Sequence, residues 1–104
     1  MFPDIRTAFN DIFQKIAIYN LDPTSGNLTH QEDVEVIGGP APFGVSPDGQ
    51  HAYSGLRTAK SMISFAIDES TGALTRTGEV DLESDPCYVS VDATGRYLLS
   101  AYYS

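Results

Sequence analysis

The sequence is poor in the residues that several common functions need. Its single cysteine, Cys87, excludes an internal disulfide and predicts a reducing, cytoplasmic compartment. Only 6 Lys and Arg stand against 14 Asp and Glu, and this net charge of −8 argues against nucleic-acid binding and against docking on an anionic membrane. The chain has no apolar run of about 18 residues, as a transmembrane helix needs, and its N-terminus lacks the apolar core of a signal peptide. These absences leave a small, acidic, globular chain.

Groups that bind metals or act as nucleophiles are equally scarce. Two histidines, His30 and His51, and one cysteine cannot form a zinc site at ligand spacing. The chain has no Gly-x-Ser-x-Gly elbow, and its Gly-Gly pair at 38–39 precedes a proline and is interpreted as a turn rather than a phosphate loop. We therefore expect no cofactor and no metal, and we expect Cys87 to be a small buried residue rather than a nucleophile.

Two segments of the chain repeat each other. Residues 17–29 (AIYNLDPTSGNLT) match residues 63–75 (ISFAIDESTGALT) at an offset of 46, with Asp, Gly, Leu and Thr identical. A second pair follows in the same order, because residues 42–49 (PFGVSPDG) match residues 86–95 (PCYVSVDATG). The offset of this second pair starts at 44 and returns to 46, which predicts that its second turn is two residues longer. Two pairs in one order predict a repeated structural unit.

The repeated unit is typical of an all-β fold. Short runs rich in Val, Ile, Tyr and Phe are separated by Pro, Asp and Gly turns, which predicts strands at 43–46, 51–56, 62–67 and 73–82. The connections are too short for helices, so the strands are expected to be antiparallel. Four strands in about 46 residues are typical of a β-propeller blade. The sequence predicts one partial propeller over residues 1–104, with repeats near 16–61 and 62–104 that are incomplete at both ends.

Two alternatives to this fold remain open from the residues alone. An ordinary β-sandwich could contain similar turns, because the turn residues recur for local reasons. Residues 7–18 also permit a helix, since Phe9, Ile12, Phe13 and Ile16 have helical spacing. Alignment with the second unit instead predicts a strand, a loop and the start of the next strand in this region.

The motifs together resemble the propeller-type 6-phosphogluconolactonases. The resemblance is carried by IYNLD (18–22) with GNLT (26–29), by PFGVSPDG (42–49) with YSGLR (53–57), and by YVSVDATGRYLL (88–99). It implies a seven-bladed propeller that hydrolyses 6-phosphogluconolactone to 6-phosphogluconate in the pentose phosphate pathway. Muconate-lactonising enzymes share the fold, and a non-catalytic binding or scaffold propeller is a further alternative.

The period also predicts that the chain is a fragment. Seven blades of this length need roughly 320 residues, so 104 residues amount to about 2.3 blades. We therefore expect an N-terminal fragment whose partner is the missing C-terminal blades. Its open sheet edges predict that the isolated chain aggregates or pairs with another copy. Because loops from several blades share a propeller site, the fragment alone is expected to be inactive.

The candidate site lies at one end of the predicted sheets. Turns at 22–26, 47–49, 68–72 and 93–95 are expected at the opposite end, where their Asp residues serve the turns. The loops at 10–14, 38–42, 57–61 and 84–87 should share the other end, and they carry the more varied residues.

Three side chains of these loops are candidates for chemistry. Arg57 can bind a phosphate or carboxylate with two donors, or stabilise an oxyanion, and Lys60 adds a second cation for an anionic sugar lactone phosphate. Asp85 could act as a base toward water if desolvation raised its pKa. His30 and His51 are expected away from this end, so neither is proposed as a catalyst.

Overall fold

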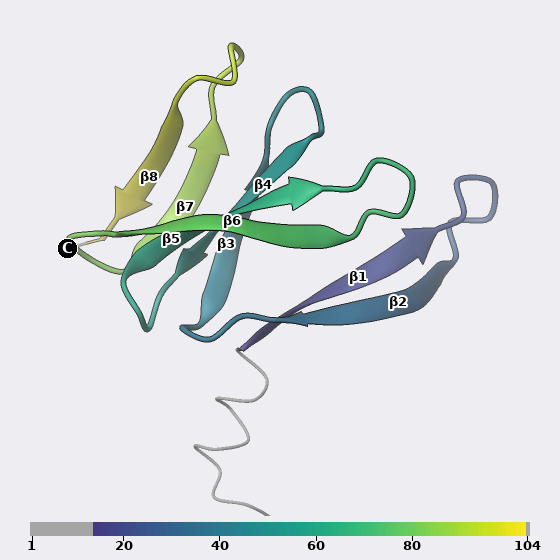
Figure 1. The fold of residues 1–104 in the computed structure, drawn as a ribbon, viewed down its shortest axis with the longest axis horizontal. Helices are drawn as coiled ribbons and strands as arrows, with labels where there is room; N and C mark the ends of the chain where they lie inside the picture. Colours follow the sequence, from purple (N-terminus) through teal and green to yellow (C-terminus); the bar gives the residue numbers. More distant parts are fainter. Residues whose placement is uncertain (1–13, 104) are drawn as a thin grey trace, which may run out of the picture.

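The computed structural model describes residues 14–103, which form eight strands in three antiparallel sheets (Figure 1). The first sheet contains β1 (Lys15–Leu21) and β2 (Leu28–Glu35). The central sheet contains β3 (Pro40–Val45), β4 (His51–Leu56), β5 (Ser61–Ile67) and β6 (Leu74–Asp81), in that order. The third sheet contains β7 (Pro86–Val91) and β8 (Leu98–Tyr102). This confirms the all-β, antiparallel fold with four strands in a complete sheet.

The offset between the repeats is 46 residues throughout. Adding 46 to the bounds of β1, β2 and β3 gives the bounds of β5, β6 and β7. Pro40 and Pro86 therefore occupy equivalent positions, and the turns after β3 and β7 have the same length, since Gly49 N–H donates to Ser46 and Gly95 N–H donates to Asp92. The expectation of a longer second turn was wrong, because it aligned Pro42 instead of Pro40 with Pro86. The repeat limits predicted at 16–61 and 62–104 stay a prediction. The second predicted repeat begins within β5, in the middle of the central sheet.

Local irregularities recur at the same spacing. The register of β1 against β2 shifts between Ile18 and Tyr19, and that of β5 against β6 shifts between Ser64 and Phe65. In the hairpin turns, Asp22 accepts a hydrogen bond from Thr24 N–H, and Asp68 accepts one from Ser70 N–H, both at 2.9 Å. These shared details confirm that the two repeats are the same structural unit.

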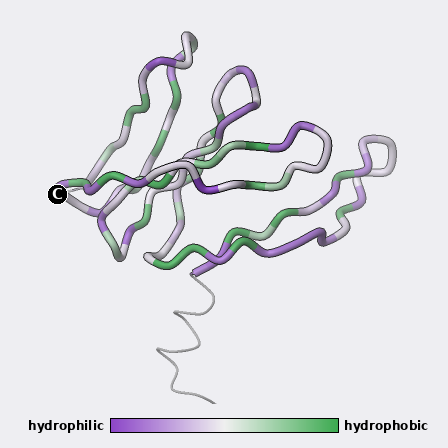
Figure 2. Tube along the Cα trace, viewed as in Figure 1, coloured by the Kyte–Doolittle hydropathy of each residue, from purple (hydrophilic) through white to green (hydrophobic). Residues whose placement is uncertain are grey.

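The apolar core lies between the first sheet and the central sheet. Figure 2 shows hydrophobic stretches along the strands and hydrophilic residues along β2 and in the hairpin turns. Burial of a large apolar side chain such as Phe65 contributes about 1.5–3 kcal/mol to folding. The buried cluster consists of Val36, Ala52, Leu56, Ile63 and Phe65, with Ile16, Val34, Ile67 and Leu74 packed around it.

The central sheet contacts the third sheet through small residues. A Cβ built on Gly55 would lie 2.5 Å from Cγ of Pro86, and one built on Gly44 would lie 3.5 Å from a methyl group of Val89. Glycine at 55 therefore allows β7 to approach the central sheet closely. This contact carries residue 85 toward the end of β4.

The observed strands differ modestly from those predicted. β3 begins at Pro40 rather than at 43, because Pro40 pairs with Leu56 beyond an irregularity in the ladder. Residues 15–18 belong to β1, so the helical alternative is wrong there, and the rest of that alternative lies outside the described residues. Within residues 14–103, no helix has the length and apolar character needed to cross a bilayer.

Candidate functional site

Three of the loops predicted to share one end of the sheets, at 38–42, 57–61 and 84–87, do meet there, and of the fourth only Gln14 is among the described residues. The loop before β3 contacts the loop after β4 through three backbone hydrogen bonds of 2.9–3.0 Å. Arg57 N–H donates to the carbonyl of Gly39, and the N–H groups of Thr58 and Ala59 both donate to the carbonyl of Gly38. These bonds hold the end of β4 in place, and with it the backbone of Arg57.

Glycine is required at both positions of this contact. Gly38 and Gly39 have φ angles of 123° and 78°, a region that residues with a side chain rarely adopt. A Cβ on Gly38 would lie 2.8 Å from Cβ of Ala59, and a Cβ on Gly39 would lie 2.7 Å from Oγ1 of Thr58. The Gly-Gly pair thus permits the close approach of the two loops, a role that its interpretation as a simple turn missed.

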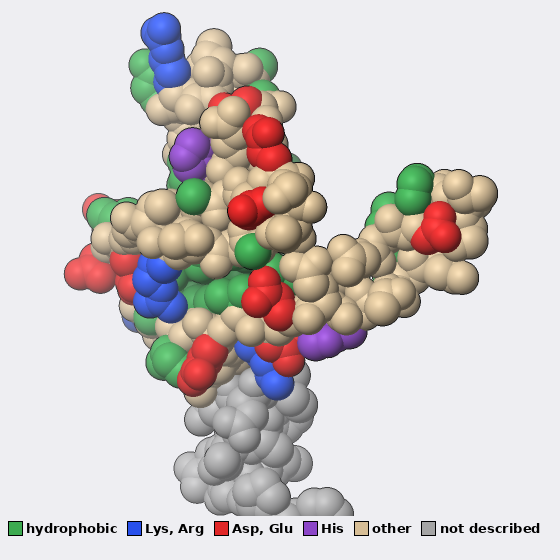
Figure 3. All heavy atoms as spheres, turned by 45° about the vertical axis from the view of Figure 1, so that its right-hand side comes forward, with side chains coloured by type: hydrophobic (Ala, Val, Ile, Leu, Met, Phe, Trp, Pro, Cys, Tyr) green, Lys and Arg blue, Asp and Glu red, His purple; other side chains and the backbone are tan. Residues whose placement is uncertain are grey.

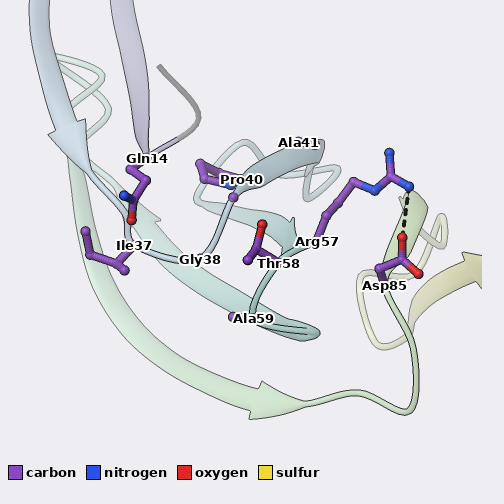
Figure 4. Close-up of a pocket in the computed structure, with 10 residues that line it drawn as sticks. Gln14, Ile37, Gly38, Pro40, Ala41, Arg57, Thr58, Ala59 and Asp85 are labelled. Atoms are coloured by element: carbon purple, nitrogen blue, oxygen red, sulfur yellow. Dashed lines mark hydrogen bonds and ion pairs between the residues drawn. The ribbon is translucent and has the colours of Figure 1, made fainter. Parts of the chain in front are cut away.

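An open cavity of about 700 Å³ lies at this end of the sheets (Figure 4). Its walls come from the loop between β2 and β3, the loop after β4, and the residue before β7. Thr58 contributes a hydroxyl group, Gln14 an amide, and Arg57 and Asp85 charged groups, while the rest of the wall is glycine and apolar residues. The lining residues are Gln14, Ile37, Gly38, Gly39, Pro40, Ala41, Arg57, Thr58, Ala59 and Asp85.

Arg57 and Asp85 form an ion pair at the cavity. Nη2 of Arg57 donates to Oδ2 of Asp85 at 2.9 Å, between residues that are 28 positions apart in the sequence. Figure 4 shows the Arg57 side chain extending from the end of β4 toward Asp85, which directly precedes β7. Both side chains remain substantially exposed, so solvent can reach the pair. The structure therefore brings together two of the three side chains predicted from the sequence.

The ion pair changes the chemistry expected of Asp85. The hydrogen bond from Arg57 is the main cause that lowers the pKa of the Asp85 carboxyl, with further contributions from backbone and Ser84 hydrogen bonds. Desolvation acts in the opposite direction and is outweighed. The condition set for Asp85 as a base, a pKa raised by desolvation, is therefore not met.

The third candidate, Lys60, is not part of the cavity wall that the described residues form. It follows Ala59 in the same loop with a φ of 55°, and its carbonyl accepts a hydrogen bond from Leu82 N–H at 2.8 Å. The role of Lys60 in anion binding stays a prediction.

The residues set aside by sequence reasoning lie elsewhere. His30 is on β2, where its Nε2 lies 2.8 Å from Oδ1 of Asp33, and His51 begins β4 beside the 46–49 turn. Neither histidine lines the cavity, as predicted. Cys87, on β7, is half-buried rather than buried, and its Sγ donates to the carbonyl of Ala101.

The Asp residues of the hairpin turns have the structural role predicted for them. The carboxyls of Asp22, Asp48, Asp68 and Asp92 accept hydrogen bonds from backbone N–H groups or hydroxyls within their own turns. These hydrogen bonds lower the pKa of each carboxyl, led by Thr24 N–H for Asp22 and by the Ser70 hydroxyl for Asp68. They are turn residues at the end of the sheets opposite the cavity.

Some cavity residues were not singled out from the sequence. Gln14, the 38–41 loop, Thr58 and Ala59 fall within segments assigned to this end, whereas Ile37 lies outside them, and none of these was singled out individually. Small or uncharged residues give no chemical signal in a sequence. The Gly-Gly-Pro run at 38–40 was the one available indication of a close backbone approach.

A four-stranded antiparallel sheet flanked by parts of two equivalent sheets at a 46-residue period defines a β-propeller. The model of one family, described as lactonase, 7-bladed β-propeller, matches residues 7–104. The chain belongs to this lactonase family of seven-bladed β-propellers.

Individual relatives agree with this assignment. A 6-phosphogluconolactonase from Pectobacterium atrosepticum is 40% identical over 91 residues, which cover 88% of this chain and 27% of that protein. The equivalent protein of Cronobacter sakazakii is 35% identical over the same shares. A crystal structure of a provisionally assigned 6-phosphogluconolactonase from Bacteroides fragilis matches with a TM-score of 0.78 and 27% identity, over 86% of this chain and 26% of that one. The chain thus spans about a quarter of the length of the curated relatives it matches.

Proposed function

We propose that this chain forms part of a lactonase that hydrolyses 6-phosphogluconolactone to 6-phosphogluconate in the pentose phosphate pathway. The observation that carries the proposal is a cation held at a cavity formed by the loops of successive sheets: Arg57, fixed by Asp85. Relatives that carry the name 6-phosphogluconolactonase support it at 35–40% identity. We also propose the cytoplasm as its compartment, because the only cysteine is unpaired.

Hydrolysis of the lactone requires three kinds of group. A water oxygen bonds to the carbonyl carbon, the carbonyl oxygen becomes an oxyanion, and the bond between that carbon and the ring oxygen then breaks. A base accepts a proton from the attacking water, and the departing ring oxygen takes up a proton to become a hydroxyl group. Donors near the oxyanion lower the barrier, and a cation can hold the phosphate of the substrate.

Arg57 is proposed to hold the phosphate group or the oxyanion. Asp85 contacts one nitrogen of the guanidinium group, which carries five N–H donors in all, so donors remain for a ligand. In a chain of net charge −8, a local cation is needed to attract an anionic sugar. Lys60 is proposed to add positive charge from the same loop, outside the cavity wall.

Asp85 is proposed as a positioning residue for Arg57 rather than as the base. A carboxylate with a lowered pKa is a weak proton acceptor, whereas its hydrogen bond fixes the direction of the guanidinium group. The base is proposed to lie on other blades, because a propeller site is formed by loops around the whole ring. The 104-residue chain alone is therefore expected to show no turnover.

Binding to the chain itself tests the Arg57 assignment. We expect 6-phosphogluconate, but not gluconate, to shift the NMR signals of Arg57 and Thr58. The Arg57→Gln variant should weaken this binding by about 10- to 100-fold, the loss expected for a charge-assisted hydrogen bond. Arg96→Gln is the matched control, because Arg96 lies in the turn at the opposite end. Equal binding by both variants would remove Arg57 from the site.

Turnover is tested in a complete propeller. The 91 matched residues of this chain replace the corresponding segment of the Pectobacterium atrosepticum enzyme, and hydrolysis of 6-phosphogluconolactone is followed. We expect the chimaera to be active and its Arg57→Gln variant to lose about 10- to 100-fold in kcat/KM. A folded chimaera without turnover would contradict the proposed function and favour a binding or scaffold propeller. Turnover by the 104-residue chain alone would contradict a site shared between blades.

A further inference from the structure

The cavity wall combines a cation with a hydroxyl group from the same loop. Thr58 directly follows Arg57, and both residues line the cavity. Figure 4 shows the Thr58 hydroxyl group and the Arg57 side chain on the same side of the loop after β4. Arg57 can bind either the phosphate or the oxyanion of a sugar lactone phosphate, and the groups around it distinguish these two roles.

The hydroxyl group of Thr58 is held in a defined place. Thr58 N–H donates to the carbonyl of Gly38 at 2.9 Å, which fixes the backbone of this residue. Its Oγ1 lies against Gly39, since a Cβ built on Gly39 would be only 2.7 Å from that oxygen. Glycine at 39 therefore leaves the space that the hydroxyl group occupies. A ligand that enters the cavity meets a hydroxyl group whose position is already set.

This hydroxyl group serves no turn of its own. Within residues 14–103, no group forms a hydrogen bond with Oγ1 of Thr58. The hydroxyl groups of Thr71 and Thr94, in contrast, bond to groups of their own hairpin turns. Arg57 likewise uses only Nη2 for a described partner, so Nε and Nη1 keep their donors. Charged and neutral donors are thus both available at the cavity.

The exposure of the ion pair favours a phosphate over an oxyanion. The side chains of Arg57 and Asp85 are 45% and 40% exposed, so water reaches them. Donors stabilise a developing oxyanion most strongly where water is excluded. A phosphate carries its charge throughout the reaction, and bidentate guanidinium binding suits its geometry. Arg57 is therefore better placed for the phosphate than for the oxyanion.

The described wall also lacks a group that could activate water. It contains no histidine, and its one carboxylate, Asp85, is bonded to Arg57 and has a lowered pKa. Attack on the lactone carbonyl requires a base close to that carbon. The phosphate of a 6-phosphorylated lactone is carried by the carbon outside the ring, away from the carbonyl. A phosphate held at Arg57 would leave the carbonyl to groups beyond the described wall.

Positive charge is scarce on the rest of the chain. Figure 3 shows Lys and Arg side chains that lie apart from one another, among more numerous Asp and Glu, on the face that it presents. Lys15 lies 3.7 Å from Asp33 on the first sheet, and Arg96 lies in the turn at the opposite end. Among the described residues that line the cavity, Arg57 is the only cation. An anion in the cavity is therefore attracted to Arg57.

We propose that Arg57 and Thr58 form the phosphate subsite of this cavity, and that the Thr58 hydroxyl group selects a 6-phosphorylated lactone over the unphosphorylated one. The assignment of a sugar phosphate rests on the proposed lactonase function. Nε and Nη1 of Arg57 donate to phosphate oxygens, while Asp85 keeps Nη2 and so the orientation of the guanidinium group. Thr58 donates its hydroxyl proton to a further phosphate oxygen.

The first test separates binding from chemistry in the chimaera with the Pectobacterium atrosepticum enzyme. Thr58→Val removes the hydroxyl group and keeps the shape of the side chain. It should raise KM for 6-phosphogluconolactone about 10-fold and leave kcat unchanged, because the phosphate is bound equally before and during the reaction. Thr58→Ser keeps a hydroxyl group and should restore KM. For glucono-δ-lactone, which has no phosphate, Thr58→Val should change neither parameter.

Thr24→Val is the matched control, because Thr24 lies in the exposed turn at the opposite end of the sheets. It should leave KM for both lactones unchanged. Three results would overturn the phosphate subsite: an unchanged KM in Thr58→Val, a lowered kcat with the same KM, or an equal loss for the two lactones.

The second test does not depend on turnover. Glucose 6-phosphate carries a phosphate but no lactone carbonyl, and glucose carries neither. We expect calorimetry to detect binding of glucose 6-phosphate, but not of glucose, to the chimaera. Thr58→Val should raise the Kd about 10-fold, and Thr24→Val should leave it unchanged.

The two tests together distinguish the subsite from the function. A folded chimaera that binds glucose 6-phosphate through Thr58 but hydrolyses no lactone would support the phosphate subsite and contradict the proposed function. Hydrolysis of 6-phosphogluconolactone, with the same affinity for glucose 6-phosphate in Thr58→Val, would overturn the subsite and support the function. Absence of glucose 6-phosphate binding at millimolar concentration would also overturn the subsite.

Discussion

The two ends of the sheets differ in how closely their residues repeat at the offset of 46. At the turn end, Asp22 and Gly26 recur as Asp68 and Gly72, with the same hydrogen bonds. At the cavity end, the equivalents of Gly38 and Gly39 are Ser84 and Asp85, and the equivalent of Arg57 is Tyr103.

The difference has a physical reason. Each hairpin turn must satisfy its own backbone, so the same residues serve every repeat. The cavity end is formed between successive sheets, where the residues can differ without breaking a turn. The chain can therefore place one Arg–Asp pair there without altering the repeat.

The largest expected effect tests whether the stability of the fold depends on the close contact between Gly39 and the loop after β4. Gly39→Ala and Gly49→Ala both place a side chain at a φ near +75°, but only Gly39 has neighbours within 4 Å. Gly49→Ala should lower the free energy of unfolding by about 1–2 kcal/mol through backbone strain alone. Gly39→Ala should cost about 1–3 kcal/mol more, because Thr58 must move. Urea unfolding measures both, and equal losses would show that the loop contact does not limit stability.

The second prediction compares two carboxyls whose pKa is lowered. For Asp85 the cause lies 28 positions away in the sequence, and for Asp68 it lies in the same turn. Arg57 lowers the pKa of Asp85, whereas residues within the turn lower that of Asp68. Arg57→Gln should therefore raise the pKa of Asp85 toward its ordinary value of about 3.9 and leave that of Asp68 unchanged. Side-chain carboxyl NMR titration measures both groups.

The same pair sets a pH dependence of stability. Because its folded pKa is lowered, Asp85 stabilises the fold above the unfolded value near 3.9, and this contribution is lost as the pH falls through the folded pKa. The Arg57→Gln variant should therefore lose less stability as the pH falls through that acidic range, and its pH dependence of stability elsewhere should be unchanged. An unchanged Asp85 pKa in the variant would show that the ion pair does not form in solution.

The smallest expected effect tests the equivalence of the two turns. Asp22→Ala and Asp68→Ala each remove the acceptor for two backbone N–H groups in an exposed turn. We expect both to lower the urea midpoint slightly, by similar amounts and by less than Gly39→Ala. A much larger loss for one of them would mean that its turn also depends on contacts outside the hairpin.

Sequence reasoning recovered the fold more completely than the site. Alternation and turn residues are local signals, and the period of 46 is visible when the sequence is compared with itself, so the strands followed from them. The alignment of Pro42 with Pro86 was wrong because strand register depends on cross-strand hydrogen bonds, and Pro40 reaches Leu56 past an irregularity that side-chain identity does not reveal. At the site, Arg57 and Asp85 were each named, but their contact was not, and the condition under which Asp85 could act as a base, a pKa raised by desolvation, is not met.

The sequence by itself determined the all-β class, the repeat, the turns and the end of the sheets at which chemistry is expected. The strands and turns follow from backbone preferences that act within a few residues, and the repeat follows from comparing the sequence with itself. Only the tertiary structure decided that Gly38 and Gly39 contact the loop after β4, that Arg57 meets Asp85, and that Lys60 does not line the cavity. These contacts depend on the angle and distance between successive sheets, which are set by the packing of Pro86 on Gly55 and of the core around Phe65. No local pattern of residues encodes that packing.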